Sequence, residues 1–250
     1  MLRSFGDSNL FGESFGEGTA RVVWLHGWAR RADDFTVAAA ALADRGVASV
    51  ALDLPGFGSS PLPTVAGGAR LYAELLLPAL AAITDEPLVL VGHSFGGTVA
   101  TVVASTHPER VRALVLVAAP LIRRAATSKA PLAYRARKWL HAKGLLSDAR
   151  IEAVRQKYGS TDYRRAHGLL RHVLVASVNE SYESELATLS MPVDFVWGEH
   201  DTDVPLDVAE RAALLLRGDH NLRVVPGVGH LLPLEAPDEL VDAVERLLAR

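Results

Sequence analysis

Six short apolar runs recur along this chain of 250 residues, and their pattern limits the fold more than any other feature. Each run is nearly continuous in apolar, often β-branched residues, which is typical of strands covered on both faces of a mostly parallel sheet. The segments between the runs have helical lengths, so the alternation predicts an α/β fold with an open sheet and helices on both faces. The predicted strands are residues 21–25, 47–52, 88–91, 114–117, 193–197 and 222–225, and the predicted helices are residues 33–43, 69–83, 95–107, 205–216 and 237–248.

The alternation is interrupted between residues 121 and 188, where apolar residues show helical spacing with no strand among them. This predicts a helical cap, or lid, inserted into a core formed by residues 1–120 and 189–250. Because it follows the predicted strand 114–117, the cap should overhang the carboxyl ends of the sheet, where open α/β sheets bind ligands. The residues that carry the helical spacing are Trp139, Leu140, Leu145, Leu146, Ile151, Val154 and 169–175.

The amino-terminal segment gives weaker signals. Residues 2–18 alternate weakly between apolar and polar types, which predicts a hairpin at one edge of the sheet. The first twenty residues have no basic start followed by a long apolar stretch, so the predicted location is cytoplasmic. The apolar stretches 36–43 and 75–83 are far shorter than the roughly 20 residues that cross a bilayer, so no membrane span is expected.

Composition and spacing exclude several kinds of chemistry. The chain has no cysteine, which rules out disulfides, thiolate nucleophiles and cysteine zinc sites. None of its nine histidines forms an i, i+4 pair with a neighbouring glutamate, so no metal is predicted. Gly56-Phe57-Gly58 and Gly67-Gly68 lack the spacing of a phosphate-binding loop. The sequence therefore predicts no cofactor.

Residues 92–97 read Gly-His-Ser-Phe-Gly-Gly and stand between an apolar run and a small-residue stretch. Such a strand, turn and helix form a nucleophile elbow, in which a serine is held in a strained turn. Glycine at positions 92 and 96 lets the strand and helix approach closely. Without the flanking strand and helix the pattern would fit a phosphate loop or an ordinary loop equally well. The context predicts that Ser94 is a nucleophile.

A serine needs a base to take its proton and a third group to orient that base. Asp201 follows the predicted strand 193–197 and is the expected acid, with Asp203 as its alternative because that residue lies nearer a helix start. His230 follows the last predicted strand in a glycine-containing loop and is the expected base. The order Ser94, Asp201, His230 is the one found on sheets of this kind.

Acyl transfer also needs donors for the developing oxyanion, usually backbone N–H groups. One is expected from Phe95, the residue after the nucleophile. The other is expected from Trp28, in the loop that follows the first predicted parallel strand.

In five successive loops this chain resembles the α/β-hydrolase superfamily, in the branch that has a serine nucleophile and a helical cap. The matching segments are His26-Gly27-Trp28, residues 53–60, 92–97, 198–205 and 227–230, and they span nearly the whole sequence. The resemblance implies an eight-stranded core with an inserted cap. The dehalogenase and epoxide-hydrolase branches have aspartate where this chain has Ser94, and the proline-aminopeptidase branch has a different elbow.

The residues near the predicted site are largely apolar, which predicts a pocket for an acyl or aryl group. We expect the pocket to include His26, Phe57, Trp139 and Leu231. For each of these residues, core packing is an equally good interpretation.

Charge is distributed unevenly along the chain. Residues 121–172 carry a net charge of +10 and the remaining residues −13. This favours the hypothesis that the basic insertion attracts substrates with an anionic tail, although a solvated helical face explains the same charges. Nucleic acid is not expected as a partner, because the rest of the chain is acidic.

These features together predict a serine hydrolase that cleaves small-molecule carboxylic esters of small to medium acyl or aryl groups through an acyl-enzyme. Hydrolysis of a carbon–carbon bond in dienoic ring-cleavage products is an alternative, because the superfamily performs it with the same three residues. A ligand receptor without enzymatic activity is a further alternative. The sequence leaves the natural substrate and the oligomeric state open.

Overall fold

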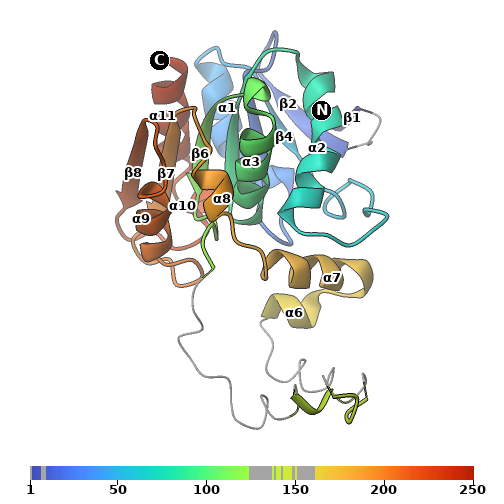
Figure 1. Cartoon of the computed structure of the whole chain (residues 1–250). Helices are drawn as coiled ribbons and strands as arrows, with labels where there is room; N and C mark the ends of the chain where they lie inside the picture. Colours follow the sequence, from blue (N-terminus) through green and yellow to red (C-terminus); the bar gives the residue numbers. More distant parts are fainter. Residues whose placement is uncertain are drawn as a thin grey trace.

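The computed structural model describes residues 2–6, 10–123, 137, 139–141, 143–147, 150 and 161–250. An eight-stranded sheet forms its centre (Figure 1). The pairs β1–β2 and β2–β4 are antiparallel, and the neighbouring pairs from β4 to β8 are parallel. The predicted α/β fold and the edge hairpin are therefore confirmed. In spatial order the strands are β1 (Leu2–Phe5), β2 (Leu10–Phe15), β4 (Ser49–Leu52), β3 (Val22–Leu25), β5 (Leu88–His93), β6 (Val111–Val117), β7 (Val193–Gly198) and β8 (His220–Val225).

Helices cover both faces of the sheet, and alternate residues of each central strand enter two separate cores. In β3, for example, Val23 and Leu25 belong to one core, whereas Val22 and Trp24 belong to the other. This explains why the strands read as continuous apolar runs. The first core includes residues of α2 (Ala69–Ile83), α3 (Phe95–Thr106), α8 (Glu183–Leu186) and α9 (Asp207–Ala213), and the second includes residues of η1 (Ala32–Phe35), α1 (Thr36–Asp44), α10 (Leu232–Glu235) and α11 (Pro237–Leu248).

Several elements differ from the predicted ones at their ends. The predicted helix 33–43 begins as the 3₁₀ turn η1, and the predicted helix 205–216 is the shorter α9. Strand β8 begins at His220 because His220 and Asn221 pair with Val193 and Asp194 of β7. Strand pairing is made by backbone N–H and C=O groups. A strand can therefore extend beyond the apolar residues from which it was predicted.

The segment predicted to be an insertion, residues 121–188, contributes α6 (Thr161–Arg165), α7 (Gly168–Ser177) and α8 to the described residues. The helical spacing at 169–175 corresponds to α7, whereas Ile151 and Val154 lie outside the described residues. Helix α8 packs against α3, and the N–H of Tyr182 donates to the carbonyl of Leu121 at 3.0 Å. The two ends of the insertion are thereby joined at the sheet, with α6 and α7 beyond its edge (Figure 1).

In the part of the chain that the structure describes, no helix combines the length and the apolar character that a membrane crossing requires.

Candidate active site

Ser94 lies in a sharp turn between β5 and α3. Its backbone has φ 49° and ψ −115°, in the region that side-chain-bearing residues rarely adopt. The turn is possible because its neighbours are glycines: a Cβ at Gly92 would lie 2.5 Å from the carbonyl oxygen of Gly96, and one at Gly96 would lie 2.1 Å from that of Leu25. The N–H of Ser94 donates to the carbonyl of Val117 at 2.8 Å, which anchors the turn to β6. The strain is thus held by close backbone packing.

The structure brings Ser94, His230 and Asp201 together from three separate loops. Nε2 of His230 lies 3.2 Å from Oγ of Ser94, and Nδ1 of His230 lies 2.8 Å from Oδ2 of Asp201. Oδ1 of Asp201 accepts the N–H groups of Asp203 at 2.9 Å and Val204 at 2.8 Å. The alternative acid, Asp203, therefore supplies its backbone to Asp201, while Asp201 itself contacts the imidazole.

The loops that carry Asp201 and His230 pack directly on each other. A Cβ at Gly198 would lie 2.2 Å from the carbonyl oxygen of Gly229, so only glycine fits between them. The N–H of His200 donates to the carbonyl of Val228 at 2.9 Å. Gly227 has φ 71°, which turns the chain back from β8 toward the elbow.

The two expected oxyanion donors both border the cavity above Ser94. Phe95 is the first residue of α3, and the first N–H groups of a helix have no acceptor within it. Trp28 lies in a turn closed by the N–H of Arg30 and the carbonyl of Gly27 at 3.2 Å, with Ala29 at φ 55°. Among the described residues, neither the Phe95 nor the Trp28 N–H has a backbone acceptor.

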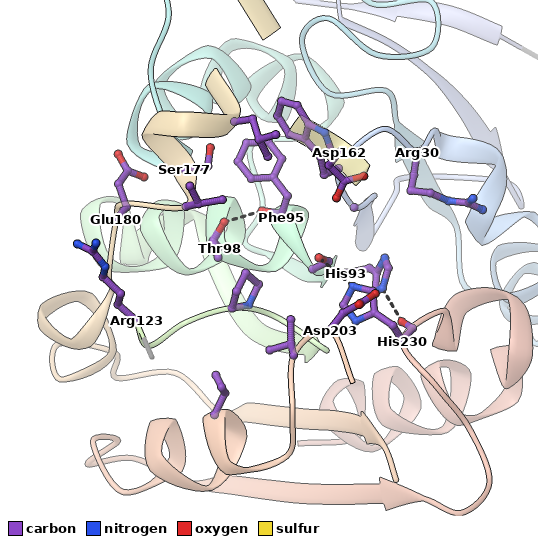
Figure 2. A pocket seen from close by; sticks show the side chains of 18 of the residues that line it. Arg30, His93, Phe95, Thr98, Arg123, Asp162, Ser177, Glu180, Asp203 and His230 are labelled. Carbon is purple, nitrogen blue, oxygen red and sulfur yellow. Dashed lines mark hydrogen bonds between the residues drawn. The ribbon is translucent and has the colours of Figure 1, made fainter. Parts of the chain in front are cut away.

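A cavity of about 920 Å³ opens over the serine, between the sheet edge and the insertion (Figure 2). Its wall combines residues of the loops that carry Ser94 and His230 with residues of α6 and α7. Apolar side chains form much of the wall between the serine and the insertion. They are Trp28, Phe95, Pro120, Ile122, Leu174, Val178, Val204, Val208 and Leu231.

Of the four expected pocket residues, Leu231 is among the described residues that border the cavity, and the other three are not. His26 is fully buried: its Nδ1 donates to the carbonyl of Gly27 at 2.7 Å, and its Nε2 accepts the N–H of Leu54 at 2.9 Å. Phe57 lies behind the wall and packs edge-on against Trp28 at 5.1 Å between ring centres. Trp139 is 59% exposed.

Charged residues of both signs border the cavity. Figure 2 shows Arg123 and Glu180 at one side of the cavity and Arg30 at the other. Arg30 is paired with Asp34, with Nε 2.6 Å from Oδ2. The described lining also includes Asp162 and Asp203, so it does not share the strong positive charge of segment 121–172, much of which lies outside the described residues.

Sequence reasoning missed several residues of the site. Val204 and Val208 follow Asp201 in the chain, so their proximity to the acid was the available signal. Leu174 and Ser177 belong to the predicted cap, but nothing in their spacing distinguished them from packing residues. His93 was treated as part of the elbow, yet its ring contacts the backbone of His230. Within the described ranges, no group of three His, Cys, Asp or Glu side chains could hold a metal ion.

A sequence model of the alpha/beta hydrolase family matches residues 22–243, which include all three residues of the Ser94, His230 and Asp201 constellation. The chain belongs to the alpha/beta hydrolase family. The resemblance seen in the sequence is thereby confirmed. Family membership fixes the fold, and it leaves the substrate open.

Within this family, two curated relatives carry the name pimeloyl-[acyl-carrier protein] methyl ester esterase. The protein of Chromobacterium violaceum is 38% identical over 149 residues, which cover 59% of this chain and 50% of the relative. The protein of Aeromonas hydrophila is 42% identical over 106 residues, which cover 42% of this chain and 40% of the relative. The matching region thus spans half or less of these relatives' lengths.

The alpha/beta hydrolase architecture is also shared with a solved structure of bromoperoxidase from Bacillus anthracis. The TM-score is 0.77, and the alignment covers 100% of both chains at 18% sequence identity. This likeness concerns the fold alone.

Proposed function

We propose that this chain is a serine esterase that hydrolyses carboxylic esters through an acyl-enzyme. The observation that carries the proposal is the continuous line of contacts from Ser94 Oγ through the imidazole of His230 to the carboxylate of Asp201. The cavity lies over this line and leaves room for an acyl or aryl group beside the hydroxyl. The names of the two curated relatives, which both describe ester hydrolysis, support the same reaction.

In the proposed mechanism, Nε2 of His230 accepts the proton of Ser94 as Oγ attacks the ester carbonyl. The carboxylate of Asp201 accepts a hydrogen bond from the Nδ1–H of His230 and so fixes the tautomer in which Nε2 is free to act as base. The protonated imidazole then gives its proton to the leaving alcohol, and the acyl group remains on Ser94. Water, activated by the same imidazole, releases the acid.

The negative charge that develops on the carbonyl oxygen requires donors that are already in place. The N–H groups of Phe95 and Trp28 are our candidates, because both border the cavity and neither has a backbone acceptor among the described residues. The position of Phe95 at the start of α3 adds the positive end of a helix dipole.

We infer that the preferred substrates carry a small to medium acyl group, since the middle of the cavity is lined by apolar side chains. The relatives' names point toward methyl esters of acyl chains within this class. We further propose that residues 121–188 act as a cap over the core 1–120 and 189–250, since Leu174, Ser177 and Val178 of this segment border the cavity. The basic segment 121–172 favours an anionic group on the substrate.

A panel of p-nitrophenyl esters of increasing acyl length, with methyl esters with and without a distal carboxylate, tests the proposal. Ser94→Ala should lower kcat by roughly 10⁴- to 10⁶-fold with little loss of stability. Wild-type protein should also be labelled by an active-site-directed phosphonate, and the variant should not. A dienoic ring-cleavage product in the same panel separates ester from carbon–carbon bond hydrolysis.

Several outcomes would contradict the proposal or part of it. Turnover retained in Ser94→Ala excludes the serine mechanism, and turnover of the dienoate in preference to every ester makes carbon–carbon bond hydrolysis the activity. Binding without turnover or labelling would instead identify a receptor. Equal kcat/KM for the neutral and carboxylate-bearing esters at low and high salt would remove the anionic group from the proposal.

A further inference from the structure

His93 ends β5 directly before Ser94, and the proposed mechanism does not use its side chain. The residue is 1% exposed, and its Nε2 lies 2.8 Å from the carbonyl oxygen of His230 (Figure 2). A carbonyl oxygen can only accept a hydrogen bond, so Nε2 must carry the ring proton. The imidazole of His93 therefore donates to the main chain of the residue that we assign as the base.

The protonation state of His93 is fixed by its surroundings. Burial, together with the neighbouring imidazole of His230, lowers the pKa of His93 to about 3. The ring is therefore neutral near neutral pH, with its single proton on Nε2. Its Nδ1 is buried and has no hydrogen-bond partner among the described residues. Burying the unpaired Nδ1 costs free energy that an apolar ring of similar size would not cost. The histidine differs from such a ring by its Nε2–H, which donates a hydrogen bond to His230.

The ring of His93 lies between the loop that carries His230 and the loop that carries Trp28. The residue is bonded to Ser94, and its ring centre lies 5.0 Å from that of His230. On the other side, a Cβ at Gly27 would lie 2.9 Å from its Nδ1, so the loop that carries Trp28 leaves just enough space for the imidazole. One buried ring thus packs between the nucleophile, the base and the expected oxyanion loop.

Besides the backbone hydrogen bond from His200 to Val228, the loop that bears His230 is tied by two exposed side chains. The N–H of Gly227 donates to Glu199 at 3.0 Å, and the N–H of Gly229 donates to Glu235 at 2.8 Å, both at the surface. Asp201 contacts the ring of His230, whereas His93 contacts its main-chain carbonyl. A buried hydrogen bond holds a position more firmly than solvated ones.

We propose that His93 is a positioning residue, whose Nε2 hydrogen bond to the carbonyl of His230 keeps the base within reach of Ser94. The inference rests on the proposed esterase function. Because a displacement of about 1 Å in a catalytic group costs up to roughly 100-fold in rate, loss of this bond should lower kcat by about 10- to 100-fold. KM should change by less than about threefold, since the apolar wall of the cavity is untouched.

The experiment compares His93→Phe, His93→Asn and His93→Gln with wild type. Phenylalanine keeps a flat ring without a donor, asparagine has an amide that is too short to reach, and glutamine places an amide donor near the position of Nε2. We expect His93→Phe and His93→Asn to lose kcat and to be labelled more slowly by the phosphonate, and His93→Gln to recover at least half of the loss on a logarithmic scale. If His93→Phe does not fold, the comparison of kcat between His93→Asn and His93→Gln tests the positioning role.

Thr101→Val is the matched control, because Thr101 is fully buried and donates to the carbonyl of Gly97 at 2.9 Å, away from the cavity. It loses one buried hydrogen bond at nearly constant volume, so it reports the effect of lost stability alone. Thermal unfolding of each variant gives the stability against which kcat is compared. A kcat in His93→Phe equal to that of Thr101→Val, or no recovery in His93→Gln, would overturn the positioning role.

Crystal structures of wild type and His93→Phe give a readout that does not depend on activity. We expect residues 227–231 to shift or to show raised B-factors in His93→Phe relative to wild type. A carbonyl of His230 in the same place, with unchanged B-factors, would overturn the inference whatever the enzyme does. Conversely, wild-type protein that neither turns over esters nor reacts with the phosphonate would remove the proposed function, while the two structures still decide whether His93 fixes the loop.

Discussion

Oδ2 of Asp201 lies 2.8 Å from Nδ1 of His230, and Oδ1 of the same carboxylate accepts two backbone N–H groups. The carboxylate is fully buried as a side chain, so its orientation is set by the loop that begins α9. The imidazole of His230 is thereby given one orientation toward Ser94.

Replacing this carboxylate by an amide should therefore disable the site while leaving its shape intact. We expect Asp201→Asn to lower kcat by about 10⁴-fold, because the amide favours the wrong tautomer of His230. Asp203→Asn should cause a far smaller loss, since its carboxylate does not contact His230. Steady-state kinetics on one aryl ester compares them, and equal losses would mean that the acid is wrongly assigned.

A buried ion pair links β7 to the last helix. Asp194 is 1% exposed, and Nε of Arg246 lies 2.9 Å from its Oδ2. Arg246→Met should lower the free energy of unfolding by about 3 kcal/mol, because it leaves a buried carboxylate without its cation. Arg45→Met is the control: Arg45 is paired with Glu245 at the surface, and its loss should cost less than about 1 kcal/mol. Urea unfolding measures both, and equal costs would show that burial does not matter here.

Close packing at the elbow makes a second stability prediction. A Cβ at Gly96 would lie 2.1 Å from a backbone oxygen, whereas one at Gly218 would have its nearest neighbour at 3.6 Å. Gly96→Ala should therefore cost about 3 kcal/mol or more and abolish turnover, because backbone must move. Gly218→Ala should stay within about 1 kcal/mol of wild type. Thermal unfolding with activity on the same samples checks this pair, and a stable, active Gly96→Ala protein would refute the close approach.

The buried imidazole of His93 predicts how stability depends on pH. The pKa of His93 is about 3 in the folded chain, against an ordinary value of 6.5. Between these two values the unfolded chain binds a proton at His93 and the folded chain does not. Stability should therefore fall as pH falls from about 7 toward 3, and His93 alone accounts for about 2 kcal/mol between pH 7 and pH 5. Burial also lowers the pKa of His26, which adds to the loss in the same direction.

Denaturant unfolding of wild type and His93→Gln at pH 5, 6 and 7 measures this contribution. Carboxylates affect both proteins alike, so the difference between the two slopes reports His93. The variant should lose less stability than wild type on acidification. If the free energies of unfolding of the two proteins depended on pH in the same way, His93 would not be held neutral in the folded chain.

Local sequence determined the helices and strands and the turn that holds Ser94. Apolar runs without alternation marked strands buried on both faces, and glycines at 92 and 96 marked a turn that only glycine neighbours permit. The ends of elements were less well determined, as at His220, because backbone pairing continues where apolar side chains stop. The chain positions of Ser94, Asp201 and His230 followed from the places where predicted strands end.

Only the tertiary structure decided which neighbouring side chains these residues meet. It placed Asp201, and not Asp203, in contact with the imidazole of His230, and it brought the buried ring of His93 against the carbonyl of His230. Of the expected pocket residues, it placed Leu231 in the described cavity wall, and His26, Phe57 and Trp139 outside it. The physical reason is that periodicity and turn preference act between residues a few positions apart. Contacts between residues 137 positions apart arise only when the sheet places separate strand ends at one edge.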